Sequence, residues 1–142
     1  MIFSHTVKTS ASPQRIWEIW TDVKNWSDWD TELIDSYLES PFTLEAKGKL
    51  TSKKGGVTTF RISQLVPGKS YTFQCQLPLC SLNVSRIIDN RSDGTYFTHK
   101  VWFEGISAFV FSLILGKQFQ TVLPTVMENV KRIAETAHKL PQ

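Results

Sequence analysis

The sequence predicts an α+β fold in which seven antiparallel strands curve around one long C-terminal helix. Three observations support this prediction. Apolar and polar side chains alternate with a period of two over residues 2–9 and through most of residues 33–104. Two short stretches of helical period lie between these regions, and a long amphipathic stretch follows them. A sheet of this size must cover one face, and the C-terminal helix is its large apolar partner.

The N-terminal part of the chain predicts one strand and two short helices. Residues 2–9 have the alternation of a half-buried strand. Ser12 and Pro13 then favour a helix start, because a serine oxygen can accept from an unpaired N–H and proline suits the first helical position. We expect this helix to end near Asp22 and a second helical turn to cover residues 25–29.

Six further strands are predicted downstream, and their short connections indicate an antiparallel meander. Residue pairs typical of turns separate them: Ser40-Pro41, Gly55-Gly56, Pro67-Gly68, the single Pro78, and Asp93-Gly94. The strands are expected near residues 33–40, 44–53, 57–66, 70–77, 81–89 and 95–104.

The last segment predicts a long helix with one buried stripe. From Phe119 onward, apolar side chains recur at i, i+3, i+4 and i+7. Pro124 lies inside this pattern and should kink the helix or mark a fresh start. Before it, eight of the ten side chains from Ile106 to Leu115 are apolar. We expect this run to form the loop and first turns leading into the helix, at the mouth of a gap between helix and sheet.

Length, charge and cysteine content limit the classes of function. With 142 residues, we expect a single domain over residues 1–142. A net charge of +3 is too small to indicate nucleic-acid binding, and the lysines around Gly55-Gly56 predict a solvated hairpin. The run at 106–115 is shorter than the roughly 20 apolar residues that a bilayer requires, so no stable membrane insertion is expected. Two cysteines and the absence of a signal peptide favour a cytoplasmic protein with reduced thiols.

Several stretches match a known group of domains. They are the segment ASPQRIWEIWTDVKNWSDWD at residues 11–30, Pro41-Phe42 with Gly48 after it, and Gly105 with the apolar run that follows. With these motifs and this order of elements, the chain resembles the START-like, birch-pollen-allergen-like helix-grip superfamily (SRPBCC). Within it, the chain is most similar to the bacterial polyketide cyclase/dehydrase and lipid-transport family. The resemblance implies a cavity for hydrophobic or amphipathic small molecules, and no single activity.

Candidate ligand-binding residues come from the inner face of the sheet, the short helices and the C-terminal helix. They are Trp26, Trp29, Phe60, Tyr71, Phe73, Val84, Arg86, Phe97, His99, Val101, Phe109, Phe111, Leu115, Phe119 and Leu123. Each apolar position has the alternative interpretation of ordinary core, because aromatic stripes usually pack. Trp26 and Trp29 are expected either to form one wall of the cavity mouth, opposite residues 106–115, or to plug the end of the sheet.

Three polar residues, His5, Arg86 and His99, share the inner face. His5 and His99 are expected across one strand pair, because the first and last strands are neighbours in a helix-grip sheet. Arg86 is expected nearly opposite Phe97 and diagonal to His99. A buried charge or imidazole needs a partner, and a ligand carboxylate or carbonyl oxygen would suit Arg86. Alternatively, the histidines bond backbone groups and Arg86 extends to solvent.

These features support three hypotheses of function. The first is a carrier or sensor that binds a lipid, isoprenoid or polyketide-like molecule. The second is a cyclase or dehydratase in which His5 or His99 moves protons and Arg86 or Tyr71 stabilises an enolate oxygen. The third is a protein-interaction module. Burial is expected to account for the apolar side chains, which disfavours this hypothesis, and an exposed apolar patch of more than several hundred Å² would support it. No metal or cofactor is expected, and the acidic residues within 28–32 should lie on an exposed turn.

Overall fold

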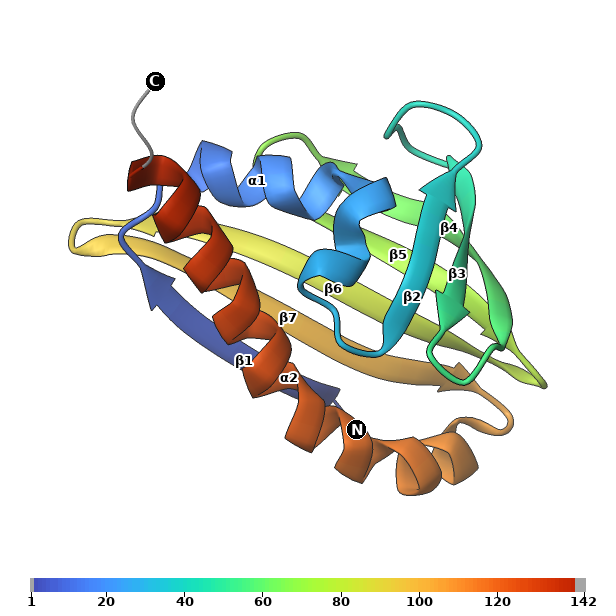
Figure 1. Ribbon diagram of the computed structural model, residues 1–142. Coiled ribbons are helices and arrows are strands. Elements are labelled where there is room, and N and C mark those ends of the chain that lie inside the picture. The colour runs from blue at the N-terminus through green and yellow to red at the C-terminus, as the bar shows by residue number, and fades with distance from the viewer. Residues whose placement is uncertain (1, 140–142) are drawn as a thin grey trace.

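Seven strands form one antiparallel sheet that curves around a long C-terminal helix (Figure 1). The computed structural model describes residues 2–139, with side chains to residue 136; Met1 and residues 140–142 of the expected domain lie outside this range. The elements are β1 (Ile2–Thr9), α1 (Pro13–Thr21), the 3₁₀ helix η1 (Val23–Asp28), β2 (Leu33–Leu38), β3 (Lys47–Ser52), β4 (Val57–Val66), β5 (Ser70–Leu77), β6 (Cys80–Arg91), β7 (Gly94–Gly105) and α2 (Ala108–Lys139).

The order of strands across the sheet is β1-β7-β6-β5-β4-β3-β2. The first strand therefore pairs with the last, and the remaining strands form a meander. The α+β helix-grip prediction is confirmed, including the two short helices between β1 and β2. Ser12 caps α1 as expected, because its Oγ accepts from the backbone N–H of Arg15 at 3.1 Å.

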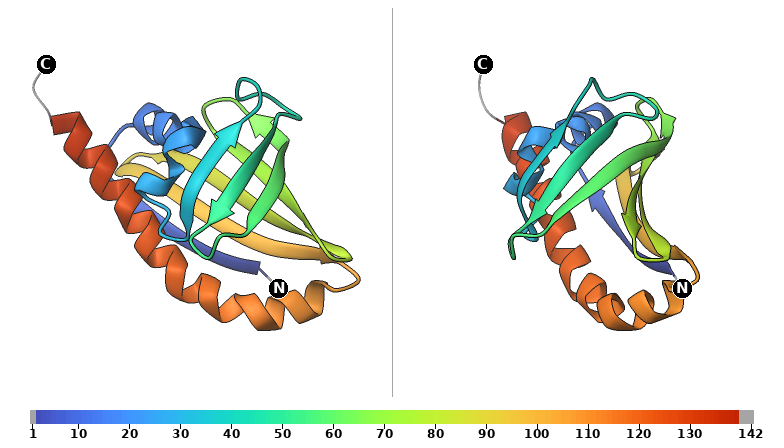
Figure 2. Two further views of the ribbon diagram at one scale, coloured as in Figure 1. Left: turned by 45° about the vertical axis from the view of Figure 1, so that its right-hand side comes forward. Right: turned by 90° about the vertical axis from the view of Figure 1, so that its right-hand side faces the viewer.

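The concave face of the sheet holds the core, with α2 across it. Figure 2 shows α2 running beside β1 and β7, with α1 and η1 over the upper part of the sheet. The buried stripe of α2 contains Leu123, Val126, Met127, Val130 and Ala134. These side chains pack with the inner-face residues of the strands, which gives the helix–sheet layer that the apolar period predicts.

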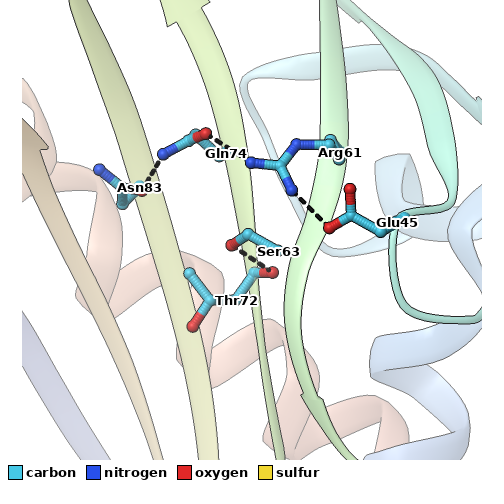
Figure 3. A network of polar contacts seen from close by, with 6 residues as sticks. All are labelled: Glu45, Arg61, Ser63, Thr72, Gln74 and Asn83. Carbon is cyan, nitrogen blue, oxygen red and sulfur yellow. Dashed lines mark hydrogen bonds and ion pairs between the residues drawn. The ribbon is translucent and has the colours of Figure 1, made fainter.

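The outer face of the sheet is polar, as the alternation of the strands requires. Arg61 donates to Glu45 at 2.6 Å and to Gln74 at 2.9 Å, and Figure 3 shows this network across neighbouring strands. Gln74 in turn donates to Asn83 at 3.0 Å. Hydrogen-bonded side chains thus cover the face that α2 does not.

Helix α2 begins earlier than the helical pattern from Phe119 indicates. It starts at Ala108, so most of the apolar run at 106–115 is helical, and it passes through Pro124 without a break. By length and composition, residues Ala108–Thr136 would suffice to cross a membrane. A core helix meets the same criteria, and here the stripe from Leu123 onward packs on the sheet.

The connection between β7 and α2 depends on a glycine. Gly105 has φ +127°, and a Cβ at this position would lie 2.6 Å from the carbonyl oxygen of Leu79. Ser107 follows and holds the start of α2 to the β5–β6 turn, donating through Oγ to the Pro78 carbonyl at 2.5 Å and through its backbone N–H to Leu79 at 3.2 Å. Only glycine allows this close approach without strain.

Candidate ligand-binding cavity

A cavity of about 160 Å³ lies between the sheet and α2. Its lining is mostly apolar, and four of its fifteen residues are polar or charged. Seven of the lining residues are among those expected from the sequence: Phe73, Val84, Arg86, His99, Val101, Phe119 and Leu123. The sheet and the middle of α2 therefore bring together the central part of the expected site.

Other expected residues lie outside the cavity lining. Trp26, Trp29, Phe60, Tyr71 and Phe97 are buried in the core. Of the two interpretations given for Trp26 and Trp29, their burial favours the one in which they pack in the core at the end of the sheet.

The expected residues on the first turns of α2 separate into two groups. Phe111 and Leu115 are half-buried against the core, with the ring of Phe111 stacked 6.2 Å from that of Phe103. Phe109 is 69% exposed and points away from the core. The first turns of α2 therefore do not line the cavity.

Eight lining residues were not among the expected site residues. They are Asp30, Glu32, Leu33, Leu50, Cys75, Leu82, Val122 and Val126. Strand alternation is consistent with the inner-face position of Cys75 and Leu82, and the helical period from Phe119 is consistent with Val122 and Val126 facing the sheet. For Asp30 and Glu32 no comparable signal exists, because the turn that carries them has no regular period.

A row of polar side chains crosses four neighbouring strands. Tyr71 on β5 pairs with Arg86 on β6, Arg86 pairs with His99 on β7, and His99 pairs with His5 on β1. The expected pairing of His5 with His99 is confirmed. The expected position of Arg86 opposite Phe97 is wrong by two residues, because β6 and β7 continue to a two-residue turn between Arg91 and Gly94.

Arg86 lies inside the protein with its charge unpaired. It is 1% exposed, so the alternative in which it extends to solvent is excluded. One guanidinium nitrogen donates to the Tyr71 hydroxyl at 2.6 Å, and the rings of Trp26 and Trp29 lie 4.6 and 4.8 Å from its central carbon. Within the part of the chain described, Arg86 forms no ion pair, and its Nε has no hydrogen-bond partner.

His99, beside Arg86, also has an unsatisfied polar atom. It is 5% exposed, and its Nδ1 has no hydrogen-bond partner. Burial lowers the pKa of His99 well below its ordinary value, and the charge of Arg86 lowers it further. The imidazole is therefore neutral near pH 7.

Asp30 lines the same cavity and is half-buried, which corrects the expectation of a fully exposed acidic turn. Its Oδ1 accepts from the backbone N–H of Glu32 at 3.0 Å. Burial raises the pKa of the Asp30 carboxyl, while this hydrogen bond and the charge of Arg86 partly offset the rise. Glu32 accepts from Gln118 of α2 at 2.7 Å and pairs with Lys53 at 3.0 Å. These contacts connect the turn before β2 to α2 and to the residue that follows β3.

Two other titratable groups near the cavity, Cys75 and Tyr71, are buried. Burial raises the pKa of the Cys75 thiol to about 12, so it is protonated and a poor nucleophile at neutral pH. The Tyr71 hydroxyl donates to the Trp20 carbonyl at 2.5 Å and accepts from Arg86.

Among residues 2–136, no group of three His, Cys, Asp or Glu side chains is placed to hold a metal ion.

A second surface of note surrounds the first turns of α2. We call it the α2 patch, and its side chains are between 52% and 88% exposed: Leu79, Ile106, Phe109, Val110, Leu113 and Ile114. The hydrogen bond from Ser107 to Leu79 keeps the two parts of the patch together. The sequence predicts that burial accounts for the apolar side chains, and the exposed α2 patch corrects that prediction.

Comparison with known proteins places this fold in a family. The model of the family described as polyketide cyclase/dehydrase and lipid transport matches residues 1–135. The chain belongs to this family. No curated protein matches the chain in sequence.

Solved structures of other proteins share the fold at low sequence identity. A protein from Nitrosomonas europaea is 9% identical with a TM-score of 0.75, covering 99% of this chain and 97% of its own. The di-domain ARO/CYC protein StfQ from the steffimycin biosynthetic pathway is 11% identical with a TM-score of 0.77, and 98% of this chain covers 52% of that one. The Aha1 dimer from Colwellia psychrerythraea is 14% identical with a TM-score of 0.69, covering 95% of this chain and 96% of its own. At these identities the likeness shows the fold alone.

Proposed function

We propose that the protein binds a hydrophobic or amphipathic small molecule in the cavity between the sheet and α2, as a carrier or sensor. The observation that carries this proposal is a mostly apolar cavity in which buried polar atoms of Arg86 and His99 lack partners. Buried polar groups are normally satisfied, and a ligand would satisfy them here. An unfilled apolar space also costs stability, at about 24 cal/mol per Å³.

The size of the cavity limits the ligand that fits without movement of the protein. Ligand pockets usually measure about 300–1,000 Å³, whereas this cavity measures about 160 Å³. A cavity of about 150 Å³ holds a molecule such as benzene. One aromatic ring or a short branched chain therefore fits, and a long acyl chain or a multi-ring polyketide requires α2 to move outward.

Native mass spectrometry of the freshly purified protein tests this proposal. We expect a discrete extra mass, and solvent extraction after denaturation should release an apolar compound. Leu123→Trp fills the cavity and should remove the extra mass, whereas Leu113→Trp on the α2 patch should retain it. The proposal fails if the wild type carries no extra mass and also binds no added toluene.

A cyclase or dehydratase is the second candidate function. It is favoured by the unpartnered Nδ1 of His99 at the cavity and by the fold that the chain shares with ARO/CYC proteins. A neutral imidazole can accept a proton at pH 7. The test is turnover of a polyketide-like substrate by His99→Ala and His5→Ala: unchanged rates in both variants would remove histidine acid–base chemistry.

A protein-interaction role is the third candidate, and the α2 patch favours it. The largest apolar patch on a typical monomer measures roughly 300–600 Å². The α2 patch gathers six large apolar side chains that each expose more than half of their surface, so we expect it to reach that area. Light scattering over a concentration series tests the role for self-association: Leu113→Asp should abolish any dimer, and a wild type that stays monomeric would exclude a second copy as the partner.

A further inference from the structure

The guanidinium of Arg86 has no compensating charge in contact with it. Among the described residues its hydrogen-bond partner is the neutral hydroxyl of Tyr71, and aromatic rings surround it. Taking an ionised group out of water is expensive unless an opposite charge or a full set of hydrogen bonds replaces the water. Aromatic faces supply part of that compensation. Among the described residues no carboxylate forms an ion pair with Arg86, and Asp30 acts on it without direct contact. The remaining part of the compensation therefore points to a negatively charged group in the cavity.

His99 lies where it can bind the same group. It is directly opposite Arg86 across β6 and β7, and such residue pairs have Cα atoms about 4.5–5.5 Å apart. Both side chains line the cavity, and each has a buried nitrogen without a partner. Two oxygens on one carbon, as in a carboxylate, can accept from a guanidinium and a neighbouring imidazole at once.

We propose that the ligand is a small organic acid whose carboxylate binds Arg86 and His99, with its apolar body against Val84, Val101 and Val126. This inference rests on the proposed function and narrows its ligand class. The three valines are in the lining of the same cavity, so head and body share one space of about 160 Å³. A neutral amide or ester of the same shape leaves the charge of Arg86 uncompensated and binds more weakly.

In the absence of ligand, Asp30 is the acidic group whose charge interacts with that of Arg86. It lines the cavity, and the charge of Arg86 acts on its carboxyl although the two groups form no ion pair. Around it lie Arg86 from β6, His99 from β7 and Glu32 from its own turn, with Lys53 bound to Glu32. The residues that α2 contributes to the lining carry no charge.

An acid that binds Arg86 therefore places a second negative charge near Asp30. Burial already raises the pKa of the Asp30 carboxyl, and a neighbouring anion raises it further. Binding of the acid therefore favours the protonated form of Asp30. The affinity for the acid should rise as the pH falls, by at most tenfold per pH unit for one proton per ligand.

The experiment is an NMR titration of the isotope-labelled protein with 4-methylbenzoate and with 4-methylbenzamide, which have nearly the same shape. We expect the acid to bind at least tenfold more tightly than the amide at neutral pH. In Arg86→Met, which keeps an unbranched apolar side chain and removes the charge, the ratio should fall to about one. If the wild type binds the acid and the amide with equal affinity, or binds toluene alone, the ligand is not an organic acid. Either result leaves the proposed function in place. If the acid, the amide and toluene all fail to bind, the proposed function fails as well.

Asp30→Asn provides a second test that does not depend on the folding of the Arg86 variant. We expect this variant to bind the acid several-fold more tightly at neutral pH and the amide unchanged. The wild type should bind the acid more tightly as the pH is lowered from about 7.5 to about 5.5. The ligand stays ionised over this range, because a free carboxyl titrates near 4.3. Asp30→Asn should therefore show no such pH dependence of its affinity for the acid. Weaker binding of the acid by Asp30→Asn would contradict the role of Asp30.

Discussion

The first half of α2 is more apolar than the second, and the two halves have opposite surroundings. From Leu123 onward, apolar side chains form one stripe that is buried on the sheet, with polar residues on the other side. In the first turns, apolar side chains point in all directions, so Phe111 and Leu115 pack inward while Phe109 and Leu113 face solvent. The cavity lies under the middle of the helix, between these halves. Apolar residues thus have three roles in one helix: core, cavity lining and exposed surface.

The largest difference between the halves should appear on truncation of single side chains. Met127 is fully buried, and Met127→Ala should lower the free energy of unfolding by about 2–5 kcal/mol. Leu113 is 61% exposed, and Leu113→Ala should change it by no more than about 0.5 kcal/mol. Urea denaturation measures both. Equal losses would mean that something covers the α2 patch in solution.

A smaller loss is expected at the connection that starts α2. Gly105→Ala should cost about 2–3 kcal/mol, because the new Cβ meets the Leu79 carbonyl at a positive φ. Gly55→Ala is the matched control, since Gly55 also has a positive φ of +93° but no atom within 4 Å of the added Cβ. Thermal unfolding of both variants isolates the contact from the backbone strain. A control that is as damaging as Gly105→Ala would contradict the role given to the contact.

The polar side of the cavity should make stability depend on pH. The pKa of His99 is lowered in the folded protein, so the unfolded chain binds more protons once the pH falls below about 6.5. Stability is therefore retained above that value and lost below it, by at most about 1.4 kcal/mol per pH unit. His99→Asn should remove this part of the acid sensitivity. A variant with the same pH profile as the wild type would show that His99 is not the group responsible.

The smallest effect should come from filling the cavity from the helix side. Val126→Leu adds one methylene toward the cavity and should raise the free energy of unfolding by about 0.5–1 kcal/mol. The same change at Val110, on the α2 patch, should have no measurable effect. Differential scanning calorimetry compares the two. Destabilisation by Val126→Leu would indicate that the space is smaller than the structure shows.

The regular elements could be predicted from the sequence because their periods are strong. The pairing of His5 with His99 followed from the neighbouring first and last strands that the helix-grip resemblance implies. The register of Arg86 did not follow, because the sequence predicts a wider turn around Asp93-Gly94 than the structure has. Only two residues join β6 and β7. A shift of two residues keeps each side chain on its face, so Arg86 was placed on the correct face but opposite the wrong partner.

The candidate site was less predictable for two physical reasons. Asp30 lies on an irregular turn, where no period tells which side chain points inward. Phe109 belongs to helical turns that are apolar all round, and such a pattern does not show which side meets the sheet. Trp26 and Trp29 had two interpretations, and the structure places them deep in the core around Arg86.

Methyl NMR with bound 4-methylbenzoate tests the central claim, that the space under the middle of α2 is the ligand site. We predict intermolecular NOEs from the ligand to the methyl groups of Val101, Leu123 and Val126, which line the cavity. NOEs confined to Val110, Leu113 and Ile114 would contradict it, because the ligand would then lie on the exposed α2 patch.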